Sequence, residues 1–238
     1  MVESVRIEGV SKRYGRLRAL ARADVVLRAK TACALLGKNG AGKSTLLGIV
    51  SSLVRPTSGE VVFELAGGHT VRGPAIRRHI GVLAHASLVY GDLTAAENLA
   101  FYGRLYGIEN PARRAAEMLD EVGLASEARD RPARTYSRGM LQRLSLARAL
   151  LHDPAVLLLD EPFSGLDRDG ADAVGLLMTE ARERGRIVIV ATHDLAPVAG
   201  RLDRVLILRR GVIAHDSDSA PGAALSEGEL AARYREMA

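Results

Sequence analysis

The sequence has little cysteine, no low-complexity stretch and no long apolar run. Its single cysteine, Cys33, excludes an internal disulfide, and no Cys/His cluster has the spacing of a metal site. Cys33 lies in the apolar segment TACALL (31–36), where we expect a small core residue of a strand. The densest apolar runs, at 155–159 and 187–191, are far shorter than the roughly 20 residues of a membrane span. The polar, alternating first residues are unlike a signal peptide. These absences predict a soluble, cytoplasmic chain.

Lysine is also scarce, because the only lysines are Lys12, Lys30, Lys38 and Lys43 and the other cationic side chains are arginines. The formal net charge of +5 is compatible with an anionic partner. However, the arginines are dispersed and often stand beside Asp or Glu, as in ARERGR (181–186). We therefore interpret the charge as a generally solvated surface.

The pattern of apolar residues predicts three structural regions. Polar and apolar residues alternate at 4–10, 23–29 and 60–65, which indicates an early antiparallel sheet. Apolar strand-like segments from residue 155 onward alternate with helical patterns, which favours a mainly parallel sheet covered on both faces. Between about 94 and 151 the spacing is helical and indicates an inserted lobe.

A glycine-rich segment between a predicted strand and a predicted helix indicates a phosphate site. GKNGAGKST (37–45) matches G-x4-G-K-[ST], whose glycines let the backbone wrap a phosphate. The following helix N-terminus favours the anion, Lys43 adds positive charge at the β- and γ-phosphates, and Ser44 is a ligand for Mg²⁺. The predicted nucleotide-binding residues here are Gly37, Lys38, Asn39, Gly40, Ala41, Gly42, Lys43, Ser44 and Thr45.

Two later strands deliver polar residues to the edge where ligands bind in such sheets. AVLLLDEP (155–162) places Asp160 there as a Mg²⁺ ligand, and Glu161 next to it would orient and polarise the attacking water. ATHD (191–194) places His193 at the same edge, where a γ-phosphate contact is favoured over a purely structural histidine. These motifs predict an NTPase with Glu161, His193 and Lys43 as its catalytic residues.

Two further motifs frame the Asp160 segment: YSRGM (136–140), called here the signature segment, and SGLD (164–167), called here the D-loop. With the phosphate-binding loop, they resemble the ATP-binding-cassette (ABC) family over nearly the whole chain. The resemblance implies ATP hydrolysis, stacking of Tyr14 on adenine and a D-loop role for Asp167. It also implies a head-to-tail homodimer in which Ser137 and Gly139 face the ATP held by the other subunit.

The signature segment departs from the family pattern at one position. Ser137 can cap a helix and Gly139 permits close backbone approach, as the family requires. Arg138 replaces the commoner glycine. Two interpretations stay open: Arg138 adds charge near the γ-phosphate, or it faces solvent.

His85 stands where the family has a glutamine in the loop that touches Mg²⁺ and the attacking water. The resemblance implies a possible metal contact for His85, and the alternative is an incidental surface histidine. The same loop couples the helical lobe to a membrane partner in the family. We expect a groove around 88–90 and 101–106 to receive a short helix from that partner, although core packing is an equal explanation for Phe101.

The set of motifs, with His85 the most discriminating, looks like the ATPase of the haem exporter used in cytochrome c maturation. The alternative is the ATPase subunit of a multidrug or peptide-type exporter, and a soluble ABC ATPase acting on nucleic acid or ribosomes is disfavoured. The implied partners are integral membrane transporter subunits and no nucleic acid. The chain would then sit at the cytoplasmic face of the membrane as a peripheral subunit, with ATP and Mg²⁺ as cofactors.

The predicted fold class is α/β: a P-loop NTPase (RecA-like) core with a mainly parallel sheet, an N-terminal antiparallel β subdomain and an inserted helical subdomain. We expect a single nucleotide-binding domain over 1–238. Its parts are the β subdomain (about 1–31 and 59–72), the ATP-binding core (about 32–58, 73–85 and 152–214), the helical signature subdomain (about 92–151) and a C-terminal helix (215–238). The C-terminal helix would start at Ser226, with Glu229 completing a capping box.

Overall fold

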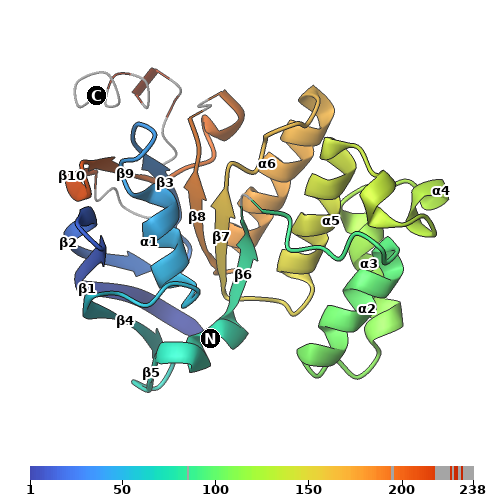
Figure 1. Cartoon of the computed structure of the whole chain (residues 1–238), viewed down its shortest axis with the longest axis horizontal. Coiled ribbons are helices and arrows are strands. Elements are labelled where there is room, and N and C mark those ends of the chain that lie inside the picture. The colour runs from blue at the N-terminus through green and yellow to red at the C-terminus, as the bar shows by residue number, and fades with distance from the viewer. Residues whose placement is uncertain (85, 194–195, 218–225, 227, 230–231, 233–238) are drawn as a thin grey trace.

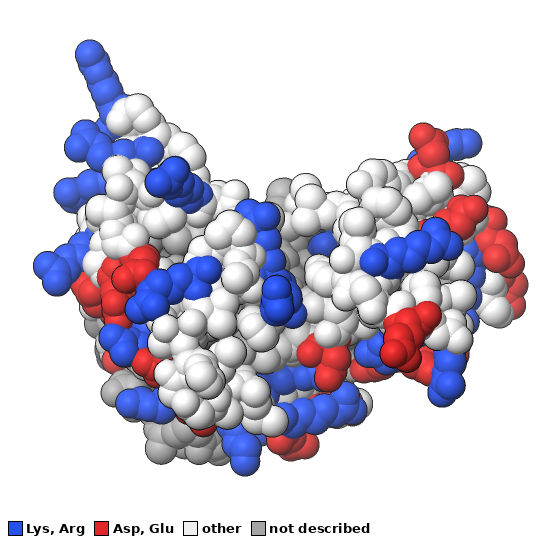
Figure 2. All heavy atoms as spheres, turned by 90° about the horizontal axis from the view of Figure 1, so that it is seen from below, with Lys and Arg blue, Asp and Glu red and all other residues white. Residues whose placement is uncertain are grey.

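The computed structural model describes residues 1–84, 86–193, 196–217, 226, 228, 229 and 232. The described part of the chain contains two sheets and a helical lobe, with the lobe on the side of the larger sheet away from the smaller one (Figure 1). Among the residues described, no helix is both long and apolar enough to cross a membrane. Figure 2 shows Lys and Arg interspersed with Asp and Glu over one face, which agrees with a dispersed surface charge.

The smaller sheet is antiparallel and has the strand order β2-β1-β4-β5. Its long central strand β1 pairs with β2 and β4, so that Val5 lies opposite both Leu27 and Phe63. All three side chains are fully buried, which explains why alternation in the sequence indicated this sheet. The strands are β1 (Val2–Tyr14), β2 (Leu17–Arg28), β4 (Ser58–Leu65) and β5 (Thr70–Arg72).

The larger sheet has the order β10-β9-β3-β8-β7-β6, and all its strands are parallel except β10 at one edge. Because the other five run the same way, their carboxyl ends meet at one edge, where ligands bind in such sheets. The strands are β3 (Ala32–Leu36), β6 (Ile80–Leu83), β7 (Val156–Asp160), β8 (Ile187–Ala191), β9 (Arg204–Arg209) and β10 (Val212–Asp216).

The larger sheet separates two apolar cores. In β3, Ala32, Ala34 and Leu36 belong to the core shared with the helical lobe. Cys33 and Leu35 point to the opposite core, which is shared with the smaller sheet and the helix after β3. The structure confirms Cys33 as a core residue, and burial raises the pKa of its thiol to about 12.

Helices fill the space on both sides of the larger sheet. Helix α1 (Lys43–Val50) lies between the two sheets, whereas α2, α3, α4 and α5 form the helical lobe (Figure 1). Thr94 and Glu97 form a capping box at α2, and Asn110, Ser137 and Asp167 cap α3, α5 and α6 with their side chains. The remaining bounds are α2 (Ala95–Leu105), α3 (Pro111–Glu121), α4 (Ser126–Arg129), α5 (Arg138–Leu150), α6 (Arg168–Glu183) and the 3₁₀ turns Gly73–His79, Ala133–Thr135 and Ala196–Val198.

Two features near the C-terminus differ from the expectation or lie beyond it. Strand β10 was not predicted, because its half-exposed residues follow a turn at Gly211 and carry no continuous apolar run. It ends at Asp216, so the predicted start of the C-terminal helix region at 215 is wrong. At Ser226, the backbone N–H donates to Oε2 of Glu229 at 2.8 Å and the backbone N–H of Glu229 donates back to Oγ of Ser226 at 3.3 Å, as in a capping box. Most of the predicted C-terminal helix lies outside the described residues.

Candidate functional site

The phosphate-binding loop runs from the end of β3 to the start of α1, and its glycines are required by their conformation and surroundings. Gly37, Gly40 and Gly42 have φ values of 150°, 79° and 110°. A Cβ at Gly37 would lie 2.5 Å from the carbonyl oxygen of Leu208, and one at Gly42 would lie 2.6 Å from that of Ala19. No other residue fits at Gly37 or Gly42 without moving the backbone.

Lys43 is the first residue of α1, and its side chain folds back along the loop. Only 8% of Lys43 is exposed, and its Nζ donates to the carbonyl oxygens of Gly37 at 2.6 Å and Lys38 at 3.4 Å. The ammonium is therefore held over the loop backbone. Ser44 follows with an exposed side chain in the first helical turn, where backbone N–H groups also point outward.

Asp160, Glu161 and His193 meet at the carboxyl edge of the larger sheet, as predicted from their positions after strands. Asp160 ends β7, and the backbone N–H of Glu161 donates to the carbonyl oxygen of Ala191, the last residue of β8, at 2.8 Å. Oε2 of Glu161 lies 2.9 Å from Nδ1 of His193. Because β8 stands between β7 and β3, the same edge carries the phosphate-binding loop.

Glu161 has a φ of 51°, in the left-handed region that side chains with a Cβ rarely adopt. Its side chain is only 23% exposed, and Oγ1 of Thr192 donates to Oε2 at 3.4 Å. A strained backbone at a carboxylate is typical of a functional position.

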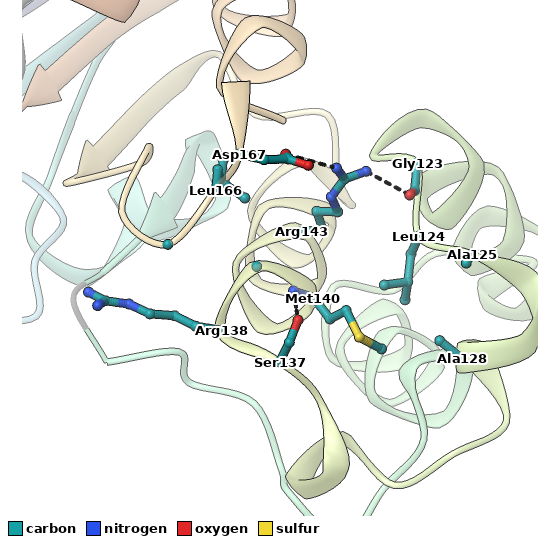
Figure 3. A pocket seen from close by; sticks show the side chains of 12 residues that line it. Gly123, Leu124, Ala125, Ala128, Ser137, Arg138, Met140, Arg143, Leu166 and Asp167 are labelled. Carbon is teal, nitrogen blue, oxygen red and sulfur yellow. Dashed lines mark hydrogen bonds and ion pairs between the residues drawn. The ribbon is translucent and has the colours of Figure 1, made fainter. Parts of the chain in front are cut away.

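The residues of the signature segment and the D-loop meet in a hollow of about 620 Å³ between α4, α5 and α6 (Figure 3). Ser137 caps α5 by accepting from the backbone N–H of Met140 at 3.3 Å. Asp167 caps α6 by accepting from the N–H of Gly170 at 3.0 Å, and it lies 3.9 Å from Arg143. The structure therefore brings Ser137, Gly139 and Asp167 together, in a group separate from the P-loop residues.

Tyr14, at the end of β1, is 48% exposed, and the ammonium of Lys12 lies 4.9 Å from its ring centroid. The ring is therefore available to a flat ligand. His85, the predicted metal contact, lies outside the described residues.

Arg138 is exposed, as one of the two interpretations expected, and it also makes a contact that neither anticipated. Its side chain is directed away from Ser137 and Met140 (Figure 3), and its guanidinium donates to Oγ of Ser164 in the D-loop. Sequence reasoning also missed Gln142, whose amide donates to the carbonyl oxygens of Glu161 at 3.3 Å and Pro162 at 2.7 Å. No local sequence pattern predicts these contacts, because they join residues about 20 or more positions apart in the chain.

A cluster of aromatic residues lies between α2 and the segment before it. Tyr90, Phe101 and Tyr102 pack ring against ring at centroid distances of 5.2 to 6.1 Å. Asn98, 1% exposed, holds the segment through its amide, which binds the backbone of Tyr90, Leu93 and Thr94. Sequence reasoning did not single out Asn98, although a polar residue on the apolar side of a helix is a usable signal.

The phosphate-binding loop, the edge carboxylates and the parallel sheet together define a P-loop NTPase. The family model for ABC transporters matches residues 20–164, so the chain belongs to the ABC transporter family.

Relatives and solved structures agree with that assignment. The linearmycin resistance ATP-binding protein LnrL of Bacillus subtilis is 34% identical over 208 residues, covering 86% of this chain and 66% of LnrL. The doxorubicin resistance ATP-binding protein DrrA of Mycobacterium tuberculosis is 35% identical over 215 residues, covering 88% and 64%. The dimeric post-hydrolysis structure of the cassette MJ0796 bound to ADP and Pi has a TM-score of 0.80 and 27% identity, covering 90% of this chain and 97% of that one. The chain thus spans just under two thirds of the length of these two curated relatives.

Proposed function

We propose that this chain is the ATP-hydrolysing subunit of an ABC exporter and drives a separate membrane subunit. The observation that carries the proposal is the contact between Glu161 and His193 at the edge that also holds the phosphate-binding loop. A carboxylate oriented by an imidazole can polarise an attacking water, and the neighbouring loop can hold the phosphates that the water attacks.

In this proposal, separate residues bind the phosphates, hold Mg²⁺ and activate the water. The loop from Gly37 to Thr45 wraps the phosphates, and Lys43 exchanges its two backbone acceptors for phosphate oxygens. Ser44 and Asp160 offer the hydroxyl and carboxylate oxygens that Mg²⁺ prefers, and the ion would neutralise phosphate charge when bound. Glu161 accepts a proton from the attacking water.

His193 would have two functions at this edge. Its Nδ1 fixes the Glu161 carboxylate, and its side chain is 78% exposed, so the ring remains accessible to the γ-phosphate. Tyr14 would stack on the adenine.

We further propose that two copies pair head to tail. The hollow with Ser137, Gly139 and Asp167 lies on the helical lobe and has no phosphate-binding loop of its own. In the paired form it would cover the ATP on the other copy. The dimeric ADP-bound structure of the similar cassette MJ0796 supports this arrangement.

The aromatic cluster is the proposed docking site for the membrane subunit, which would hold the chain at the cytoplasmic face of the membrane. Leu88 is 44% exposed, Tyr90 50% and Leu105 68%, whereas Phe101 is half-buried between the tyrosines. An apolar helix would cover these side chains. The mixture of charges in Figure 2 does not favour a nucleic-acid partner on that face.

The names of the relatives favour a drug or antibiotic exporter over the haem exporter. LnrL and DrrA are named for resistance to linearmycin and doxorubicin. Haem export rests only on the set of motifs in the sequence, among which His85 is the most discriminating. A histidine that contacts Mg²⁺ or water is compatible with either kind of transporter.

Replacing Glu161 with Gln tests the ATPase proposal. Hydrolysis should fall at least about 100-fold, because a general base contributes that much or more. ATP binding should persist, and the variant should form an ATP-dependent dimer in size-exclusion chromatography. Glu109→Gln, an exposed carboxylate on the helical lobe, is the matched control and should hydrolyse ATP like the unchanged protein. Equal turnover in both variants contradicts the proposal.

A deletion strain separates the two export classes. Loss of the chain should raise susceptibility to amphipathic antibiotics and leave the level of covalent c-type cytochromes unchanged. The opposite result would favour haem export.

A further inference from the structure

The segment from Glu161 to Asp167 contacts one helix, α5, at its start, in its middle and at its end. At its start, Gln142 donates to the carbonyl oxygens of Glu161 and Pro162. At its end, Asp167 lies 3.9 Å from Arg143. In the middle, Arg138 donates to Oγ of Ser164. Arg138 and Gln142 are four residues apart, so both extend from the same face of α5.

The middle contact is a packed one as well as a polar one. A Cβ at Gly165 would lie 2.6 Å from both Cγ and Cδ of Arg138, so the aliphatic stem of the arginine lies directly against the D-loop backbone. A Cβ at Gly139 would lie 3.1 Å from the carbonyl oxygen of Gly165. The signature segment and the D-loop are therefore in contact through backbone, stem and guanidinium.

We propose that Arg138 is a positioning residue that sets the placement of the segment 161–167, and with it the Glu161 carboxylate. This inference rests on the proposed ATP hydrolysis. Without the arginine, two backbone hydrogen bonds remain in the middle of the segment, both at 3.2 Å. The N–H of Ser164 donates to the carbonyl oxygen of Glu161, and the N–H of Leu166 donates to the carbonyl oxygen of Phe163. These bonds shape the turn but do not join it to α5. A glycine at position 138 would lack the side-chain connection.

The geometry also distinguishes this role from a phosphate contact. The guanidinium already has an acceptor within its own chain, and its stem runs along Gly165 toward that acceptor. Loss of an arginine that binds a phosphate would weaken the affinity for ATP. Loss of a positioning residue instead lowers the rate at which bound ATP is hydrolysed.

The test is a kinetic double-mutant cycle on the full chain with Arg138→Met and Ser164→Ala. Each change should lower kcat for ATP about threefold to tenfold, with KM within about twofold, because each removes the same charge-assisted hydrogen bond. The double variant should be no slower than the slower single variant. Arg138→Lys, which can still donate to Ser164, should recover most of the rate. Arg113→Met removes another exposed arginine, from α3, and should leave kcat unchanged.

Three results would overturn the proposal. The first is an unchanged kcat in Arg138→Met, and the second is losses of kcat that add up in the double variant. The third is a raised KM in Arg138→Met while the Ser164→Ala variant has the same kinetics as the unchanged protein. The last result would assign Arg138 to phosphate. The same cycle read by urea unfolding tests the contact without ATP, since coupled losses of stability require it. A chain that hydrolyses no ATP but shows this coupling would disprove the proposed function and not the contact.

Discussion

Nδ1 of His193 lies 2.9 Å from Oε2 of Glu161. Glu161 directly follows β7, and His193 is the second residue after its parallel neighbour β8. The end of β8 thus holds Glu161 twice: the carbonyl of Ala191 accepts from its backbone N–H, and the residues after Ala191 approach its carboxylate. With the Nδ1 proton donated to the carboxylate, Nε2 is the nitrogen left for a ligand.

Removal of the imidazole should therefore slow hydrolysis without abolishing nucleotide binding. We expect His193→Ala to lower kcat about tenfold to a hundredfold, because the carboxylate loses its orienting partner. His69→Ala is the control, since His69 is exposed in the turn between β4 and β5. Steady-state ATPase kinetics measure both, and an equal loss in the two variants would argue against a specific role for His193.

The left-handed backbone of Glu161 should cost folding stability. Glu161→Ala and Glu161→Gly both lack the carboxylate, but only glycine accepts a φ of 51° without strain. We expect the glycine variant to have a free energy of unfolding about 1 kcal/mol higher than the alanine variant. Glu183, the last residue of α6, should give the opposite order because glycine disfavours helix. Urea denaturation decides, and an alanine variant as stable as the glycine variant would show that the strain is absent.

Asn98 should be worth more than an ordinary helix cap. Its buried amide satisfies four backbone groups in the segment 90–94, so Asn98→Ala should lower the free energy of unfolding by about 2–4 kcal/mol. Asn110→Ala, which removes a cap of α3, should cost only about 1 kcal/mol. Thermal or urea unfolding provides the comparison. Equal losses would mean that the 90–94 segment is held instead by the packing of Tyr90 against Phe101 and Tyr102.

The acid stability of the chain should depend on His152. Burial lowers the pKa of His152 from 6.5 to about 4, with Arg148 and Arg186 acting in the same direction and the backbone of Ile80 and Asp153 opposing it. The ring also stacks on Tyr106 at 3.8 Å. Well above pH 6.5 both the folded and the unfolded chain carry neutral His152, so protonation of His152 takes nothing from the free energy of unfolding there.

As the pH falls from 6.5 to about 4, the unfolded chain takes up a proton that the folded chain excludes, and stability declines. His152→Gln should remove this part of the decline, on the order of 1 kcal/mol after allowance for partial exposure. Urea midpoints at several pH values measure it. Parallel pH curves for the two proteins would exclude His152 as the cause.

Contiguous motifs could be predicted from the sequence, whereas contacts across the fold could not. The glycine spacing of 37–42 and the apolar run ending at Asp160 each encode their own local structure, and Ser137 was predicted to cap a helix and does so. The link between Arg138 and Ser164 depends on how α5 packs beside the segment after β7. No periodicity carries that information. Strand β10 was missed for a similar reason, since its pairing with β9 and not its composition makes it a strand.

The close packing of Gly37 and Gly42 has a thermodynamic consequence. Their neighbours Leu208 and Ala19 belong to different sheets, β9 of the larger and β2 of the smaller, and the N–H of Gly211 donates to the carbonyl of Ala41 at 2.9 Å between them. Any ligand that orders this loop must also favour the docked arrangement of the two sheets. By reciprocity, a change that disfavours the docking of the two sheets also weakens ligand binding, and the coupling free energy is the same in both directions. The affinity for nucleotide should therefore depend on how favourable the docking of the two sheets is.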